Sequence, residues 1–507
     1  MRKALFLLFP ILAGCFREAA DPFALAPSSP FSSWSPAKGN TLISSRFCET
    51  LLPPSFGTNA LNLAELIDIG LQNNPSTKQT WAMARSAAAE YGIVLSNFYP
   101  NVQFSSQYTR VRGTFGPSTV FSTSPTASES ASAAEGGTSA PTLGSTSSTG
   151  FGLYSTTAGP DVELTYTLFD FGQRSSAATA AREALYFADW THNQEIQIII
   201  QTIMDDYYLY LYQQRVLRSN EENLENACAA LDAANQKFAL GLAALGDVAQ
   251  ARTQYLQTKI NLTTQKQNVE NAFAQLAVDL GLPANLGFKV QPMPDEIEAE
   301  PMMENVDQLV AIAQNQRQDL LAAQADLRSK EALLLNAKRA VYPVLATSLD
   351  IGKYWFQGHQ EEQYHWVAEL TLSFPIFQGF FYKNSMKKAM ANRERSAAKL
   401  MQTELGIIQN VSTSHMYVKT SAENLKDSNE YLKAAELEFN IALSSYKAGT
   451  KTILDVLSAQ SALADARSKK AAAQKDWYTS LASLAYATGS LCLPADTTAE
   501  CKKINSL

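Results

Sequence analysis

Hydrophobic and polar positions along this chain follow two different periods, one typical of helices and one typical of strands. A helical period predicts a short helix at Leu61–Leu71 and a second helix that continues to about Phe98. Apolar and polar residues then alternate at every second position in Asn101–Val111 and in Asp161–Leu168, which predicts two strands. The same alternation returns much later, in Leu345–Ile351 and His365–Phe374.

Long helices are predicted by two stretches without proline, between Pro160 and Pro283 and between Pro375 and Pro494. Both are rich in Ala, Leu, Gln, Glu and Lys, and they break only near Gly241–Gly246 and Lys447–Gly449. A helix from Gly172 to Phe238 would be on the order of 100 Å long. Such helices must pack side by side as coiled coils.

The whole pattern occurs twice at a constant spacing. Matching residues lie 208 positions apart through the helices and 243 positions apart upstream, so the first copy carries an insertion of 35 residues. The Ser/Thr/Gly-rich stretch Gly113–Gly159 accounts for that insertion. The pairs at the shorter spacing are Tyr166/Phe374, Phe169/Phe377, Phe238/Tyr446, Gly241/Gly449, Asp247/Asp455 and Gly281/Gly489. A constant register predicts one structural unit that was duplicated, with two copies that pack as pseudo-equivalents.

The N-terminus has the pattern of an export signal. Arg2 and Lys3 precede the short apolar core Ala4–Ala13, which has too few residues to span a bilayer. Leu12-Ala13-Gly14-Cys15 resembles a bacterial lipobox, in which Cys15 is lipidated and becomes the mature N-terminus. The alternative is an ordinary secretory signal cleaved elsewhere. Phe16 follows Cys15, so the aspartate that typically retains lipoproteins at the inner membrane is missing.

Composition narrows the function classes. A formal net charge of −7 argues against nucleic acid as a partner. The most apolar run, Ile196–Tyr212, is interrupted by polar residues, so any further membrane crossing is expected to use strands. The four histidines, His192, His359, His365 and His415, show no metal-ligand spacing, and no nucleotide-binding or nucleophile motif is present. We therefore expect no enzyme activity, no metal and no cofactor. Cys492 and Cys501 are close enough in sequence for a local disulfide, although free thiols are an equal alternative.

The two predicted helix breaks, together with the strand-to-helix junctions, resemble the outer-membrane efflux protein family, the TolC-like channel-tunnels. The segments that carry the resemblance are Tyr446–Leu457, Phe238–Gly241 with Asp247–Arg252, Leu168-Phe169-Asp170 and Ile376-Phe377-Gln378. The resemblance covers about Leu61 to Gly489. It implies a mainly α fold with four barrel strands per chain, which a homotrimer completes to a twelve-stranded outer-membrane barrel above an α-helical periplasmic tunnel. It also implies that the duct conducts its substrates passively. The energy for export would come from an inner-membrane transporter, which docks through a periplasmic adaptor protein.

The resemblance also assigns roles to residues near the helix breaks. Asp455 and Asp247 would form a ring of carboxylates at the tunnel entrance that favours cations; the alternative is that each is a helix N-cap. Lys451 and Tyr446 would belong to a network that holds the entrance closed, the alternatives being a solvated charge and coiled-coil packing. Phe238, which has no hydroxyl, is expected to pack. Gly241 and Gly449 would supply the positive backbone angles of the tip turns.

These expectations divide the chain into five parts. Residues 1–15 form the lipoprotein signal peptide, and residues 16–60 a Pro/Ser-rich extended arm. The first repeat covers 61–286, with an extracellular loop at 113–159, the second covers 300–490, and 491–507 is a short tail. The expected function is export of drugs or other small molecules across the outer membrane. Two alternatives remain open: the duct of a type I protein secretion system, and a lipid-anchored coiled-coil structural or adhesive protein without a pore.

Overall fold

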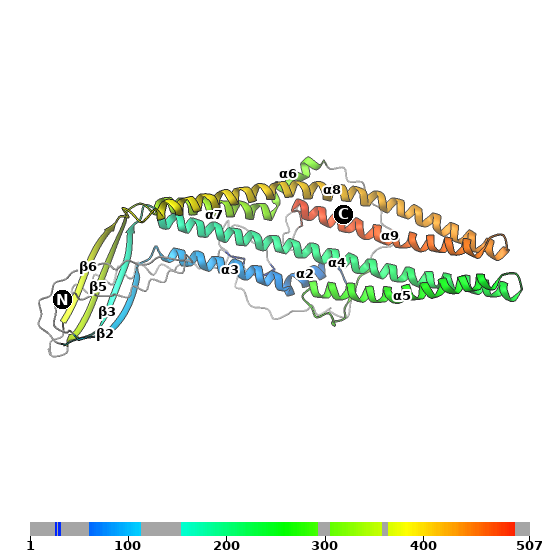
Figure 1. The fold of residues 1–507 in the computed structure, drawn as a ribbon, viewed down its shortest axis with the longest axis horizontal. Coiled ribbons are helices and arrows are strands. Elements are labelled where there is room, and N and C mark those ends of the chain that lie inside the picture. Colours follow the sequence, from blue (N-terminus) through cyan, green and yellow to red (C-terminus); the bar gives the residue numbers. More distant parts are fainter. Residues whose placement is uncertain are drawn as a thin grey trace. The chain divides into compact units, whose positions relative to one another are not determined.

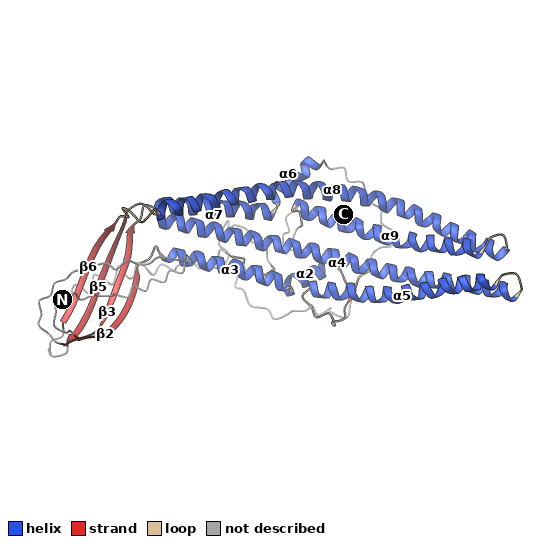
Figure 2. Cartoon of the chain, viewed as in Figure 1, coloured by secondary structure: helices blue, strands red, loops and turns tan. Residues whose placement is uncertain are grey.

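The computed structural model describes residues 26–27, 29–31, 60–112, 154–292, 305–356 and 363–491. These residues form two compact units (Figure 1). The sheet unit comprises Ser96–Arg174 and Arg339–Gly379, and the helical unit comprises the described residues outside those two segments. Figure 2 shows that the long strands all belong to the sheet unit.

The elements of the described chain follow one order twice. A short helix, a helix, two strands and two long helices, α2-α3-β2-β3-α4-α5, are followed by α6-α7-β5-β6-α8-α9. The helices of the first copy are α2 (Leu63–Asn73), α3 (Pro75–Ser96), α4 (Gln173–Ala239) and α5 (Leu245–Asp279). Those of the second copy are α6 (Val306–Gln316), α7 (Gln318–Arg339), α8 (Phe381–Ala448) and α9 (Ile453–Thr488). Two short strands, β1 (Ala60–Leu61) and β4 (Lys289–Val290), pair in parallel.

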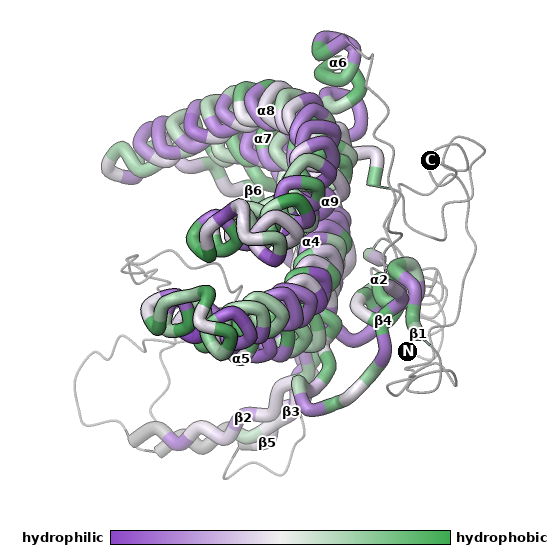
Figure 3. The backbone as a smooth tube through the Cα atoms, turned by 90° about the vertical axis from the view of Figure 1, so that its right-hand side faces the viewer, coloured by the Kyte–Doolittle hydropathy of each residue, from purple (hydrophilic) through white to green (hydrophobic). Residues whose placement is uncertain are grey.

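The long helices occur where the proline-free stretches predict them. Helix α4 has 67 residues and helix α8 has 68, and neither contains proline. Figure 3 shows hydrophilic and hydrophobic residues interspersed along both helices. Among the described residues, no helix has the length and hydropathy that crossing a membrane requires.

The helical unit has two equivalent hydrophobic cores, one for each copy. In the first, Leu66 of α2, Ile203 of α4 and Leu276 of α5 are fully buried. The residues at the matching positions, listed in the same order, are Leu309, Val411 and Leu484, and they are buried in a second cluster. Burying one such side chain stabilises the fold by about 1.5–3 kcal/mol. The duplication seen in the sequence is therefore also a duplication of the packing.

The sheet unit is one antiparallel sheet with the strand order β2-β3-β5-β6. Its strands are β2 (Asn101–Arg112), β3 (Tyr154–Phe169), β5 (Val344–Phe356) and β6 (Gln363–Ser373). Directly paired residues point to the same face of a sheet. One face carries the apolar row Val102, Leu164, Leu349 and Ala368. The other carries the polar residues Gln103, Glu163 and Asp350, and Val367 of β6 is the fourth member of that row. Strands β2 and β6 are the edges of this sheet.

One predicted boundary is wrong. The predicted loop 113–159 ends too late, because β3 begins at Tyr154 and its backbone pairs with Arg112 of β2. The six residues Tyr154–Gly159 include a tyrosine and two threonines, residue types that favour strands, and they extend the hairpin by continuing the register of Asp161. Residues 113–153 of the predicted loop lie outside the described residues.

Candidate functional site at the helical tips

The candidate site lies at the two turns that join the long helices, α4 to α5 and α8 to α9. Both turns close in the same way: the N–H of Gly241 donates to Phe238 O at 2.9 Å, and the N–H of Gly449 donates to Tyr446 O at 3.0 Å. Gly241 has a φ of 77° and Gly449 a φ of 86°. An added Cβ would meet no atom within 4 Å at either position. Glycine is therefore required by the backbone angle and not by crowding.

Asp455 is held by the start of its own helix. The backbone N–H of Thr452 and its hydroxyl both donate to Asp455 Oδ2, at 2.9 and 2.7 Å, and the N–H of Asp455 donates back to the Thr452 hydroxyl. The hydroxyl bond, the backbone bond and the nearby charge of Lys451 lower the pKa of Asp455. This is a capping box in which Thr452 is the N-cap and Asp455 is the third residue of the helix, so the alternative that Asp455 is itself the N-cap is wrong. Lining of a tunnel entrance by Asp455 stays a prediction.

Asp247 occupies the matching position with a weaker cap. The N-cap is Ala244, at the position of Thr452, and it offers no hydroxyl, so the alternative that Asp247 is itself the N-cap is also wrong. The N–H of Ala244 donates to Asp247 Oδ2 at 3.3 Å. The carboxylate of Asp247 is thus less tightly held than that of Asp455. A role for Asp247 in the entrance ring also stays a prediction.

Tyr446 is buried against a residue that the sequence analysis did not select. Its side chain is 3% exposed and packs with Phe439, Ile453 and Val456. The ammonium of Lys237, on α4, lies 4.1 Å from the centre of the Tyr446 ring and donates a hydrogen bond to the Tyr446 carbonyl. Burial, followed by the charge of Asp247, raises the pKa of Tyr446. Within the described residues, the Tyr446 hydroxyl has no hydrogen-bond partner.

The remaining tip residues are exposed in the single chain. Lys451 is exposed and lies near Asp455, and no ion pair of the described residues joins it to Asp247. Phe238, for which packing is predicted, is 45% exposed. The network around Lys451 and Tyr446 that the resemblance implies therefore stays a prediction. The structure adds Lys237, whose contact with Tyr446 joins the two copies; its counterpart in the second copy is Ser445, so the repeat gave no signal for it.

Several predicted features fall outside the described residues. These are Cys15, Cys492, Cys501 and His359. His192 Nδ1 lies 2.9 Å from the Thr80 hydroxyl, and His365 Nε2 lies 2.5 Å from Asp350 Oδ1. Among the described residues, no group of three or more His, Cys, Asp and Glu side chains is placed to hold a metal ion.

Three aspartates of α4, of which Asp189 is buried and Asp205 and Asp206 are half-buried, form a second group that could not be recognised from the sequence. Asp189 of α4 is fully buried, neither of its oxygens has a hydrogen-bond partner among the described residues, and burial raises its pKa to about 8. Burial also raises the pKa of Asp206 to about 8, with a further contribution from Asp279. Burial raises the pKa of Asp205 to about 6. Aspartates in a polar helix usually face solvent, so composition offered no signal for them.

Two repeats of a helix pair, a strand pair and a long helical hairpin define the class to which this chain belongs. The family model described as "Outer membrane efflux protein" matches residues 66–282 and 309–490. The chain therefore belongs to the outer membrane efflux protein family. The two matched segments contain all six buried core residues named above.

Individual relatives agree with this assignment. The chain is 25% identical over 355 residues to outer membrane protein TolC of Escherichia coli (strain K12). The matched region covers 67% of this chain and 71% of TolC. The chain is 24% identical over 428 residues to protein CyaE of Bordetella pertussis, covering 82% and 81%. The solved CmeC outer membrane channel of Campylobacter jejuni superposes with a TM-score of 0.70 at 17% identity, covering 95% of this chain and 98% of that one. At this identity the superposition shows the shared fold.

Proposed function

We propose that this protein is a homotrimeric duct of the outer membrane that conducts small molecules out of the cell. The observation that carries the proposal is the sheet unit: four strands in one antiparallel sheet, with edge strands β2 and β6 that have no further strand partner among the described residues. A four-stranded sheet cannot close on itself in a membrane, where every backbone group needs a partner. Three copies supply twelve strands, with the apolar rows facing lipid and the polar rows facing the lumen.

The tips support docking of a periplasmic adaptor. Leu240, Leu242 and Leu245 at the first turn are between 66% and 73% exposed, and Leu454 at the second turn is 65% exposed. Clustered exposed leucines are typical of protein interaction sites. The adaptor would connect the duct to an inner-membrane transporter, which supplies the energy. The duct itself carries out no covalent chemistry, and Cys15 would carry the lipid that attaches the N-terminus to the outer membrane.

The names of the relatives also support a channel in the outer membrane. TolC is named as an outer membrane protein, and the structural neighbour CmeC is described as an outer membrane channel. The strand pairs, with one apolar face and one largely polar face, make a lipid-anchored coiled-coil protein without a pore the weaker alternative. Entry into the duct would be controlled at the tips, with Asp455 and Asp247 favouring cations and Lys451 and Tyr446 contributing to closure.

Conductance and mass together test this proposal. The purified full-length protein is inserted into a planar bilayer, and its mass is measured in mild detergent. We expect discrete cation-selective channels and the mass of three chains. A monomeric mass that chemical crosslinking does not change, or a bilayer that stays sealed at high protein concentration, would contradict the duct.

A further inference from the structure

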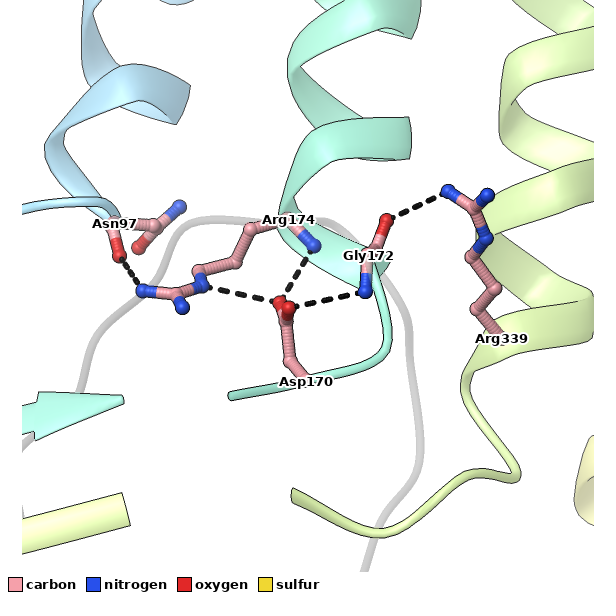
Figure 4. Close-up of polar contacts among 5 residues, drawn as sticks. All are labelled: Asn97, Asp170, Gly172, Arg174 and Arg339. Carbon is pink, nitrogen blue, oxygen red and sulfur yellow. Dashed lines mark hydrogen bonds and ion pairs between the residues drawn. The ribbon is translucent and has the colours of Figure 1, made fainter. Parts of the chain in front are cut away.

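The two ends of the sheet unit differ in how the chain continues. At one end β3 passes into α4, and a polar cluster fixes this junction (Figure 4). Asp170 accepts from the N–H of Arg174 at 2.7 Å and from its Nε at 3.0 Å, and Arg174 also donates to Asn97 O at 3.0 Å. Arg339 donates to Gly172 O at 2.9 Å. The charged side chains of this cluster therefore have partners within the sheet unit.

The far end of the sheet is formed by the two strand pairs. The strands β2 and β3 pair as far as Arg112 and Tyr154, and the strands β5 and β6 pair as far as Tyr354 and Gln363. In the proposed duct the helices lie in the periplasm, so this far end points out of the cell and meets the outer leaflet of the outer membrane.

Charged side chains are divided between the two faces of the sheet. On the polar face lie all four carboxylates of the described strand residues, together with one histidine: Asp161, Glu163, Asp350, Glu369 and His365. Among the described strand residues, the apolar face carries no carboxylate. The charged groups that its described side chains do carry are two cations, Arg110 and Lys353.

The two cations occupy the same position in the two copies of the repeat. Arg110 and Lys353 lie 353−110 = 243 positions apart, the spacing of matching residues upstream of the insertion. Their partners on the neighbouring strands, Thr156 and Tyr364, lie 364−156 = 208 positions apart, the spacing downstream of it. Arg110 follows Val102 by eight residues, about 27 Å along the strand. Because the apolar band of a membrane barrel is about 25 Å tall, the cations lie toward its outer edge.

Aromatic rings surround these cations on the apolar face. Lys353 Nζ lies 5.2 Å from the centre of the Trp355 ring and 5.3 Å from that of the Tyr364 ring. Tyr364 is 76% exposed. Arg110 is exposed, and two residues before it on the same face is Tyr108, which is 68% exposed. Cations and exposed aromatic rings at the edge of an apolar face are typical of a membrane interface.

We propose that Arg110 and Lys353 bind the phosphate groups of the glycolipid in the outer leaflet of the membrane. The inference rests on the proposed duct, which places the apolar face against lipid, and it adds the lipid that the outer rim recognises. The glycolipid of a bacterial outer membrane carries phosphates on its headgroup. Guanidinium and ammonium groups form strong charge-assisted hydrogen bonds with phosphate. Each hairpin supplies one cation, so a trimer would present such sites around its whole rim.

Titration of the full-length protein with lipid A, the bisphosphorylated anchor of this glycolipid, tests the sites. Native mass spectrometry in mild detergent counts the bound lipid. Arg110→Gln combined with Lys353→Gln should weaken binding by roughly fivefold for each cation removed. Lipid A without its phosphates should bind the parent as weakly as lipid A binds this double variant. The matched control is Lys387→Gln, at an exposed position of α8, which should bind like the parent.

A charge-preserving variant guards against loss of folding. Arg110→Lys combined with Lys353→Arg should bind lipid A like the parent, and binding as weak as that of the glutamine variant would overturn the proposal. Equal binding of lipid A with and without its phosphates would also overturn it. Displacement of the lipid by excess inorganic phosphate would do the same, because the ligand would then be a soluble anion.

Channel recordings separate this inference from the duct itself. Both cations lie on the face opposite the carboxylates, so the glutamine variant should keep the single-channel conductance of the parent. If the parent forms channels and lipid A binds the parent and the glutamine variant equally, the lipid site is wrong and the duct stands. If the parent binds lipid A through these cations and forms no channels, the duct is wrong and the lipid site stands.

Discussion

The Lys237 ammonium lies over the ring of Tyr446, 4.1 Å from its centre, and at the same time donates to the Tyr446 carbonyl. One side chain of the first repeat therefore holds the last turn of α8 in the second repeat. The contact engages the ring and the backbone of Tyr446, and the Tyr446 hydroxyl has no hydrogen-bond partner in the part of the chain that the structure describes. Substitutions can therefore test separately whether the ring or the hydroxyl of Tyr446 contributes to closing the tip.

Lys237→Ala should loosen the tip and raise the conductance of the closed channel. A hydrogen bond to a charged group contributes about 1.5–3 kcal/mol and a cation–π contact about 0.5–1 kcal/mol when exposed. Tyr446→Phe is the matched control, because it keeps the ring and the carbonyl and should leave conductance unchanged. Single-channel recordings of both variants would decide the matter; a larger effect from Tyr446→Phe would show that the hydroxyl acts between copies.

Two substitutions can separate the charge of Asp455 from its hydrogen bonds at the start of α9. Asp455→Asn keeps an oxygen that accepts from Thr452 and removes the charge, so cation preference and block by multivalent cations should fall while helix content stays constant. Thr452→Ala does the reverse: it weakens the cap and keeps the charge. Reversal potentials in a salt gradient would report the selectivity. Equal selectivity in the parent and in Asp455→Asn would remove Asp455 from the ring.

Lys451→Ala should open the closed tip partially without changing its preference for cations. The expected effect is small, because an exposed ion pair contributes about 0.2–1 kcal/mol, although it is repeated in each copy. The measurement is conductance together with reversal potential. If Lys451→Ala and Asp455→Ala change both quantities alike, the two residues do not have separate roles.

Asp189 predicts a specific dependence of stability on pH. Burial raises its pKa from 3.8 to about 8, so between these values the unfolded chain loses the proton that the folded chain keeps. The contribution of Asp189 to stability is complete below about pH 4 and is lost as the pH rises to about 8. Asp189→Asn should remove this loss and be more stable by roughly 1–3 kcal/mol near pH 8.

Thermal unfolding followed by circular dichroism at about pH 5 and about pH 8 checks this prediction. The control is Asp427→Asn, at an exposed position of α8. A parent and an Asp189→Asn variant that lose the same stability between the two pH values would show that Asp189 is already ionised in the folded state.

Much of the fold could be predicted because its signals are local or repeated. The absence of proline predicts α4 from Gly172 to Phe238, and the helix extends over Gln173–Ala239. Alternation at every second residue predicts β2 as Asn101–Val111, and the strand is one residue longer. The spacing of the repeat also predicts which core residues correspond, as Ile203 and Val411 show.

The features that sequence reasoning missed depend on contacts between segments far apart in the chain. Lys237 is an ordinary helix lysine until α8 brings the Tyr446 ring beneath it. Asp189 is one of many polar residues in α4, and only packing makes it buried. The start of β3 was missed because Tyr154–Gly159 adjoins a low-complexity stretch, and pairing with β2 decides its conformation.

The two strand-to-helix junctions share a backbone conformation but exchange two residue types. Phe171 and Gly172 have φ values of 51° and 82°, and Gly379 and Phe380 have φ values of 56° and 66°. Each junction therefore places one glycine and one phenylalanine in the left-handed region, in opposite order, and a non-glycine residue there costs about 1–2 kcal/mol. The two copies of the repeat therefore share the path of the chain at this bend and not the identity of the residue at either position. An evolutionary comparison that scores each column of the two repeats separately would count two mismatches where the inherited feature, a left-handed pair, is intact.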